Sequence, residues 1–410
     1  MTRERFARLI SVTGPISPEG MEDYIGDLSC DETELLPKDA LQFTLDWNHV
    51  PLDQQAQLIA ALDAANAVPE LVEISHIMAS DSVRALNRCT AIDFQPPKPA
   101  CLSGFARDAF AFLYSQLCVI EGRKALRKRG VPEKYDMDIP ERMTRKQLRK
   151  FVETGDITFD DYPWDINFYC CCIFLMDRFY FIPYRWDGAP HAWRNRETGE
   201  VIALWESGTK VRQDGQLDGV NGIHDSSAFE TVFIETEETV TGNPVSPDGY
   251  ILPNTVTLNK CEWTQAIHDG DYLLALHIPG GMGYTPERVK RSCEMALAFY
   301  EKYYPEYHYI GFWSESWLFD PGLAGILPPD RNIIRVQRQF YRYPTLEGDA
   351  MTRLEVLGAD VDYRERKPKN SLERGLFAAW DRGEKFHDTG MFLLKEEIEK
   401  IGTDPYRKEM

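Results

Sequence analysis

The chain has 410 residues, 43% of them hydrophobic and 12% aromatic, which suffices for two or three domains with real cores and excludes a disordered chain. Its 46 Lys and Arg residues are outnumbered by 65 Asp and Glu residues, so the formal net charge is −19. A surface this acidic disfavours nucleic acid and anionic membranes as partners and suits a cationic or amine substrate.

The sequence predicts a cytoplasmic protein with reduced thiols. The first residues, Met1 to Arg5, lack the apolar core of a signal peptide, and no apolar run reaches the roughly 20 residues needed to cross a membrane. The nine cysteines include the consecutive Cys170–Cys172 but no Cys-x-x-Cys pair. We therefore expect buried, reduced cysteines and no bound metal.

Residues 1–158 are predicted to form a helical domain. Apolar residues at three- and four-residue spacing predict one helical face: Leu52, Ala56, Ile59 and Leu62. Glu70–Leu86 predicts another helix. The first half of Arg107–Arg129 is apolar nearly all round, which is typical of a central buried helix.

Positive charge is concentrated in two neighbouring segments of this domain. They are the end of the central helix and a second predicted helix, with these basic residues: Arg123, Lys124, Arg127, Lys128, Arg129, Arg142, Arg145, Lys146, Arg149 and Lys150. Such a run is either a solvated helix face or a site for an anionic group, for example the 3′-phosphate of a cofactor.

Residues 159–345 are predicted to contain a mixed sheet, because short strands with turn signals replace the helical pattern. Phe179–Trp186 is aromatic and strand-like, Ala192–Leu204 predicts a hairpin, and Glu230–Glu235 alternates. The apolar run Trp164–Met176 that precedes these strands is interpreted as a helix.

The most informative stretch joins a strand, a glycine loop and a helix. The apolar run Leu273–Ile278 meets Pro279-Gly280-Gly281-Met282-Gly283, and Thr285 then predicts a helix N-cap followed by Pro286. Glycines allow positive φ, so successive N–H groups of the loop can point at one phosphate beside the helix N-terminus. The stretch matches neither a P-loop nor Gly-x-Gly-x-x-Gly. It is therefore either a diphosphate cradle or a plain turn into a helix.

Further strands and helices are predicted after this helix. His308–Trp313 follows as a parallel strand through a right-handed crossover. Ile333–Tyr341 alternates and is predicted as the last strand, with Arg338 on its otherwise apolar side. Helices at Leu372–Trp380 and Met391–Ile401 then predict a C-terminal helical extension over residues 346–410.

This order of elements resembles the GNAT superfamily of N-acyltransferases. More specifically, residues 159–345 look like the GNAT-like C-terminal domain of a bacterial acyltransferase family that also has a helical N-terminal domain. Four stretches carry the resemblance: Glu235–Pro244, Leu276–Pro279, Ser316–Pro321 and Leu327–Gln337. The predicted fold class is therefore α+β, a helical N-terminal domain followed by a GNAT-like mixed sheet flanked by helices.

The resemblance implies that acyl-coenzyme A is the acyl donor and that the loop and helix hold its diphosphate. Carried onto this chain, the cofactor-binding residues are Ile278, Gly280, Gly281, Met282, Gly283, Tyr284 and Thr285. The loop departs from the superfamily pattern Gln/Arg-x-x-Gly-x-Gly/Ala. Pro279 lacks an N–H, and Glu287 puts a carboxylate beside the proposed diphosphate, so both residues act against coenzyme A binding.

Acyl transfer to an amine needs a neutral nucleophile and a proton for the departing thiolate. Glu235, or Glu237 beside it, is the candidate base, because a carboxylate with apolar neighbours at a strand end can have a raised pKa; the alternative is a solvated strand end. His277 is the candidate proton relay or a structural residue. Ser316 is the candidate acid or the N-cap of a short helix.

The predicted function is transfer of an acyl group from acyl-coenzyme A to the amine of a small molecule, by direct attack in a ternary complex. Glu237, Trp317 and Arg338 are the candidate substrate contacts. A serine hydrolase is disfavoured because no Gly-x-Ser-x-Gly elbow is present. The alternative is an inactive GNAT-like module that binds a small molecule or a protein in an aromatic pocket.

Overall fold

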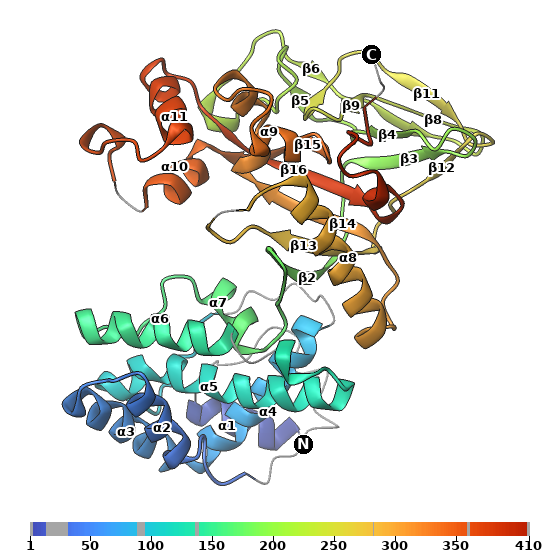
Figure 1. Cartoon of the computed structure of the whole chain (residues 1–410). Coiled ribbons are helices and arrows are strands. Elements are labelled where there is room, and N and C mark those ends of the chain that lie inside the picture. The colour runs from blue at the N-terminus through green and yellow to red at the C-terminus, as the bar shows by residue number, and fades with distance from the viewer. Residues whose placement is uncertain are drawn as a thin grey trace. The chain divides into compact units, whose positions relative to one another are not determined.

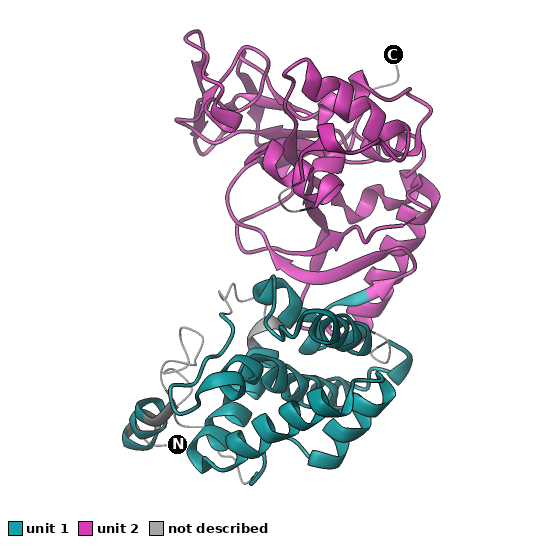
Figure 2. Ribbon diagram, turned by 90° about the vertical axis from the view of Figure 1, so that its left-hand side faces the viewer, with its two compact units in different colours: residues 1–174 teal, residues 175–410 magenta. Residues whose placement is uncertain are grey.

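The computed structural model describes residues 3–13, 32–87, 95–135, 139–281, 283–358 and 361–407 (Figure 1). The chain divides into two units, residues 1–174 and 175–410 (Figure 2). The domain boundaries predicted after residues 158 and 345 stay predictions. No helix among the described residues is long and apolar enough to cross a membrane.

The first unit is helical, as predicted. Its elements are α1 (Arg3–Thr13), α2 (Lys38–Trp47), α3 (Leu52–Asn66), α4 (Pro69–Asn87), α5 (Gly104–Arg129), η2 (Glu133–Tyr135), α6 (Ile139–Thr154) and α7 (Tyr162–Tyr169). The first half of α5 is buried nearly all round, with α3, α4 and α7 packed against it. The prediction of a central buried helix is confirmed, because only an element surrounded by others can bury an apolar surface on every side.

Two details of this unit differ from the prediction. The helix α3 exists, but Leu58 and Leu62 are buried in it while Leu52 is 80% exposed. Its buried face includes Gln55, whose amide donates to the Val50 carbonyl, and an apolar pattern cannot reveal a satisfied polar core residue. The run predicted as a helix up to Met176 ends at Tyr169, and strand β1 follows.

The second unit is built on sheets. Its strands are β1 (Phe174–Met176, shared with the first unit), β2 (Phe179–Arg185), β3 (His191–Asn195), β4 (Val201–Leu204), β5 (Lys210–Val211), β6 (Phe229–Glu230), β7 (Phe233–Glu235), β8 (Thr239–Gly242), β9 (Pro244–Ser246), β10 (Tyr250–Ile251), β11 (Val256–Asn259), β12 (Trp263–Gln265), β13 (Tyr272–His277), β14 (Tyr309–Ser316), β15 (Tyr341–Gly348) and β16 (His387–Leu394). Its helices are η3 (Val220–Gly222), α8 (Pro286–Tyr303), η4 (Trp317–Phe319), η5 (Pro321–Gly325), α9 (Asn332–Gln337), α10 (Asp349–Leu357), η6 (Tyr363–Glu365), α11 (Ser371–Asp381) and η7 (Lys395–Lys400).

A six-stranded central sheet organises this unit, with strand order β1-β2-β13-β14-β16-β15 (Figure 1). One face packs on the five-stranded sheet β10-β9-β4-β3-β12 through a shared hydrophobic core. Helix α8 covers the other face, where the Tyr300 hydroxyl donates to the Phe181 carbonyl at 2.9 Å. The pairing of β13 with β14 is parallel, as predicted for the strand–helix–strand crossover. A smaller sheet, β11-β8-β7, contains the end of the segment predicted at Glu230–Glu235, which is broken into β6 and β7.

The predicted strand Ile333–Tyr341 is wrong. Residues 332–337 form the short helix α9, and strand β15 starts only at Tyr341. The apolar alternation predicted a strand. The buried residues Ile334, Gln337 and Phe340 are three positions apart, however, and this spacing is typical of a helix. The Gln337 amide donates to the carbonyls of Leu318 and Asp320 and holds the helix in place.

The predicted helix Met391–Ile401 is also wrong. Residues 387–394 form strand β16, which lies between β14 and β15 and is buried along its whole length. A strand covered on both faces has a continuous apolar run, which periodicity cannot tell from a buried helix. The helix predicted at Leu372–Trp380 is confirmed as α11. The end of the chain is therefore part of the central sheet.

The cysteines are only partly as predicted. Seven cysteines among the described residues are free thiols, and five of these are buried. Cys261 is exposed and Cys101 is half-buried, so the expectation of burial fails for these two.

Candidate active site

The parallel strands β13 and β14 separate at their carboxyl ends. Their register runs through Leu273–Gly311 and ends at Ala275–Trp313. Beyond that pair, β13 stays paired with β2 up to His277, and β14 stays paired with β16 up to Ser316. The facing edges of the two strands are thus not paired with each other, and this opening inside the sheet suits an extended ligand that bonds to the main chain.

The glycine loop continues directly from β13 at this opening. Gly281 has φ +119° and Gly283 has φ +93°, values that only glycine adopts without strain. Among the described residues, no atom lies within 4 Å of a Cβ built on Gly280 or Gly281. Helix α8 then begins as predicted, with the Thr285 hydroxyl accepting from the Arg288 N–H at 3.4 Å. Loop and helix N-terminus together favour an anion.

Arg178, in the turn between β1 and β2, forms a hydrogen bond with the glycine loop. It is 7% exposed, and its guanidinium donates to the Gly281 carbonyl at 3.2 Å. Burial, and then the charge of Arg288, lower the pKa of Arg178. Within the described ranges of the chain, its buried Nε has no hydrogen-bond partner. A buried cation beside another cation, with an N–H unused, is an environment that binding of an anion would improve.

The carboxylate of Glu287 is compensated. Its pKa is lowered by its own main-chain N–H, by the Thr285 hydroxyl and by Arg335, whose guanidinium lies 3.1 Å away. The negative charge of Glu287, which was expected to disfavour anion binding, is therefore paired with Arg335 from α9.

Aromatic side chains form a wall on the side of the central sheet that faces the five-stranded sheet. The rings of Tyr184 and Trp313 stack with centroids 4.1 Å apart. The Trp313 indole donates to the Tyr343 hydroxyl at 2.7 Å. A Cβ at Gly390 would lie 2.2 Å from the Tyr343 ring, so glycine is required for that ring to lie over β16.

Two carboxyl groups lie on the same side of the sheet beside this wall. Glu315 pairs with Gly390, and Asp388 is two residues before Gly390 on the same strand, so both side chains share a face. Burial raises the pKa of Glu315. Burial, and then the charge of Glu315, raise the pKa of Asp388 to about 7. A carboxyl group that titrates near pH 7 suits proton transfer.

His277 lies at the end of β13, on the same face as Trp313 and Glu315 by register. Burial lowers its pKa to about 4, so the imidazole is neutral at pH 7. A neutral imidazole can both donate and accept a hydrogen bond.

Asp388→Asn is expected to stabilise the protein at pH 8 and to have little effect at pH 4. Native Asp388 has a pKa of about 7, whereas an unfolded Asp titrates at about 3.9. Between these values the native state binds more protons than the unfolded state, so the free energy of unfolding falls as pH rises. Asn removes this loss, which is on the order of a few kcal/mol at pH 8.

Thermal unfolding of both proteins at the two pH values measures this effect. Asp269→Asn, at an exposed position, is the control for the charge change. An equal shift at pH 4 and pH 8 would contradict the raised pKa.

The structure places the predicted base away from the central sheet. Glu235 ends β7 in the three-stranded sheet, and its carboxylate accepts from Lys260 Nζ at 2.6 Å. Glu237 is exposed in the turn that follows. His277 and Ser316, by contrast, lie at the ends of the neighbouring strands β13 and β14.

The other predicted contacts are dispersed. The Ser316 hydroxyl accepts from the Leu318 N–H at 3.2 Å as N-cap of η4, the alternative that the sequence left open. Trp317 is half-buried and packs against the core beneath η4. Arg338 caps the end of α9 and pairs with Asp404 at 2.6 Å.

The residues predicted for the cofactor stay together. Ile278, Gly280, Gly281, Gly283, Tyr284 and Thr285 lie in the segment between β13 and α8. The Tyr284 ring packs edge-on against Phe179. Met282 lies outside the described residues.

Sequence reasoning missed Arg178, Glu315 and Asp388. Glu315 is one residue before the candidate Ser316 in the sequence. Its pairing with β16 could not be predicted, because β16 was predicted as a helix. The signal available for Asp388 was a charged residue three positions before the apolar run Met391–Leu394.

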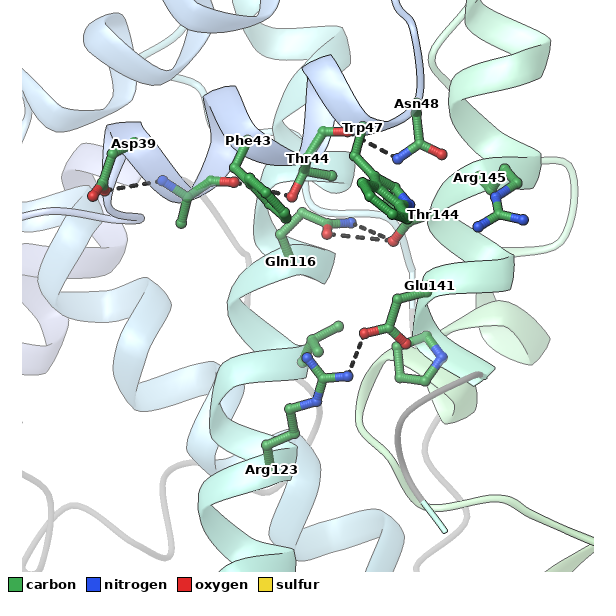
Figure 3. Close-up of a pocket in the computed structure, with 13 residues that line it drawn as sticks. Asp39, Phe43, Thr44, Trp47, Asn48, Gln116, Arg123, Glu141, Thr144 and Arg145 are labelled. Atoms are coloured by element: carbon green, nitrogen blue, oxygen red, sulfur yellow. Dashed lines mark hydrogen bonds and ion pairs between the residues drawn. The ribbon is translucent and has the colours of Figure 1, made fainter. Parts of the chain in front are cut away.

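The first unit carries a cavity of about 630 Å³ between α2, α5 and α6 (Figure 3). Phe43 and Trp47 line it and are 67% and 66% exposed. Polar groups of its wall bond to each other, Gln116 to Thr144 at 3.2 Å and Arg123 to Glu141 (Figure 3). These four polar side chains are therefore paired with each other within the wall of the cavity.

Comparison with known proteins identifies the fold of the chain. Residues 206–393 match the model of the GNAT-like C-terminal domain. No curated protein matches the sequence. Among solved structures, an acyltransferase mutant in complex with octanoyl-CoA is 16% identical with a TM-score of 0.55, and 96% of each chain is covered.

Two further structures are similar to the chain. An acyltransferase in complex with decanoyl-CoA and teicoplanin has a TM-score of 0.54 at 16% identity, over 96% of each chain. An acyltransferase in complex with decanoyl-CoA has the same score and identity, over 96% of this chain and 99% of that one. Identity this low establishes the fold and not the activity. The predicted resemblance is confirmed at the level of fold: residues 206–393 match the GNAT-like C-terminal domain, and the chain has the fold of the acyltransferases described above.

Proposed function

We propose that the protein transfers an acyl group from an acyl-coenzyme A to the amine of a small molecule, by direct attack in a ternary complex. The observation that carries the proposal is the separation of β13 from β14 beside a glycine loop that leads into the N-terminus of α8. The acyl-CoA complexes of the similar acyltransferases support it.

The residues at the opening fit such a donor. Main-chain N–H groups of the loop, the start of α8 and the buried Nε of Arg178 would hold the diphosphate. The facing edges of β13 and β14, which do not pair with each other beyond Ala275 and Trp313, would bond to an extended chain, as a sheet does to an added strand. Acyl-coenzyme A supplies an activated thioester carbonyl.

The side chains near the opening then move protons. We assign the role of base to Glu315, because Glu235 is in another sheet and is paired with Lys260. The raised pKa of Glu315 brings it closer to the working pH. Neutral His277 orients a polar group by hydrogen bonding. Ser316 accepts from the Leu318 N–H and keeps its own proton available for the departing sulfur.

Titration calorimetry with octanoyl-coenzyme A tests the donor site. Gly280→Asp is expected to weaken binding by about tenfold or more, because it adds a carboxylate next to the diphosphate. Gly280 has open space and no positive φ, so the variant brings charge without backbone strain. Gly280→Ala is the matched control and is expected to bind as the native protein does.

Release of free thiol in the presence of simple primary amines tests the chemistry. Binding without thiol release under any condition would identify the inactive binding module instead. Absence of binding to any acyl-coenzyme A, or equal binding by Gly280→Asp, would contradict the proposed donor site.

A further inference from the structure

We infer that the acceptor binds as a primary ammonium ion between the carboxyl groups of Glu315 and Asp388, beside the aromatic wall of Tyr184, Trp313 and Tyr343. The inference rests on the proposed function and specifies the acceptor side of the same site.

The strand register brings these groups together. Glu315 on β14 pairs with Gly390 on β16, and Gly390 pairs with Tyr343 on β15. Asp388 is two residues along β16 and therefore points to the same side. The Thr345 hydroxyl on β15 donates to the Asp388 carbonyl at 2.8 Å. Three adjacent strands thus contribute to one small surface.

Asp388 is a buried acid, 6% exposed. In the part of the chain that the structure describes, no cation pairs with it and its Oδ1 atom has no hydrogen-bond partner. The charged groups that act most strongly on it come from each neighbouring element and are all acidic: Glu315 on β14, Glu347 on β15, Asp320 before η5 and Glu355 on α10. His387 beside it is engaged with Asp320, to which its main-chain N–H donates. A buried carboxyl with an unused oxygen among acids is a site for a cation.

The aromatic wall is fixed against this site. Trp313 is held by the stacked Tyr184 ring and by its hydrogen bond to Tyr343. Glu315 and Tyr343 both pair with Gly390, so their side chains lie on the same face of the sheet. Burial and, among the smaller causes, the charge of Glu315 raise the pKa of both Tyr184 and Tyr343. Aromatic rings next to carboxylates recognise ammonium ions through their negative faces.

Two carboxyl groups match the two protons that an ammonium must lose. One N–H proton passes to the carboxylate of Asp388 and leaves a neutral amine. The N–C bond then forms and the C–S bond breaks. The second proton passes from the nitrogen to Glu315 and on to the Ser316 hydroxyl, which gives its own proton to the thiolate, so the products are an amide and free coenzyme A. An alcohol acceptor would need to lose only one proton.

The test uses n-hexylammonium and its neutral counterpart n-hexanol as probes at pH 8, with the full chain. The native protein is expected to bind n-hexylammonium and not n-hexanol. Asp388→Asn and Glu315→Gln are each expected to weaken this binding by about tenfold or more, whereas the control Asp269→Asn leaves it unchanged. All variants are expected to bind octanoyl-coenzyme A as the native protein does, which shows that they are folded.

The outcomes separate the two proposals. Equal binding of n-hexylammonium by native protein and Asp388→Asn, or binding of n-hexanol with similar affinity, overturns the ammonium site. Ammonium binding that depends on Asp388 in a protein that does not bind octanoyl-coenzyme A supports the ammonium site and contradicts the donor proposal. Weaker ammonium binding at pH 5 than at pH 8 is a further expected result, because Asp388 is then protonated.

Discussion

Glu315→Gln is expected to lower the rate of acyl transfer by about 10²- to 10⁴-fold, the usual contribution of a general base. The amide keeps the size of the side chain but cannot take a proton at neutral pH. Affinity for octanoyl-coenzyme A is expected to stay unchanged. The proposed diphosphate site is in the loop after β13, whereas the side chain of Glu315 is on β14.

Thiol release from octanoyl-coenzyme A, measured with a primary amine that the native protein acylates, gives this rate as a function of pH. The rate of the native enzyme is expected to rise with pH as the carboxyl group loses its proton, and the residual rate of Glu315→Gln lacks this rise. Glu301→Gln, at an exposed position of α8, is the control. If Glu315→Gln transferred the acyl group at the native rate, Glu315 would not be the base.

Gly311→Ala is expected to destabilise the second unit by about 1–3 kcal/mol, the usual cost of overpacking against a rigid neighbour. A Cβ at this position would lie 2.3 Å from the Leu393 carbonyl oxygen and 3.0 Å from Leu394 Cα. These are main-chain atoms of β16, which is held between β14 and β15. The two strands would have to move apart to relieve the contact.

Gly325→Ala is the matched control for this substitution. It has no positive φ and no atom within 4 Å of the added methyl group, so its effect is expected to stay within about 0.5 kcal/mol. Denaturant unfolding of the two variants measures the difference. Equal midpoints would show that β16 does not pack against β14 as described.

The strand, loop and helix around Gly281 were predictable because each part is specified locally. An apolar run, a loop with three glycines, an N-cap threonine and a following proline occupy the 14 residues Leu273–Pro286, and each acts on its neighbours along the chain. The parallel pairing of β14 with β13 was predictable from the strand–helix–strand connection through α8. The structure has all of these elements.

The acidic pair was not predictable, because it depends on strand order. Glu315 and Asp388 are far apart in the chain and meet only because β16 lies beside β14. The sequence of β16 is buried on both sides and has no alternation, so its pattern did not distinguish it from a helix. Because β16 was predicted as a helix, the sequence also did not show why residue 390 is a glycine. In the structure, Gly390 leaves space for the Tyr343 ring.

The sequence by itself determined the α+β class, the helical first part, and the glycine loop that leads into α8, since periodicity, capping and glycine conformation are local properties. Tertiary structure alone decided which carboxyl groups share a surface, that Glu287 is paired with Arg335, and that β13 and β14 separate at Ala275 and Trp313. Burial and the charges of distant residues set the pKa of Asp388 and of His277, and these depend on which strands the fold brings together.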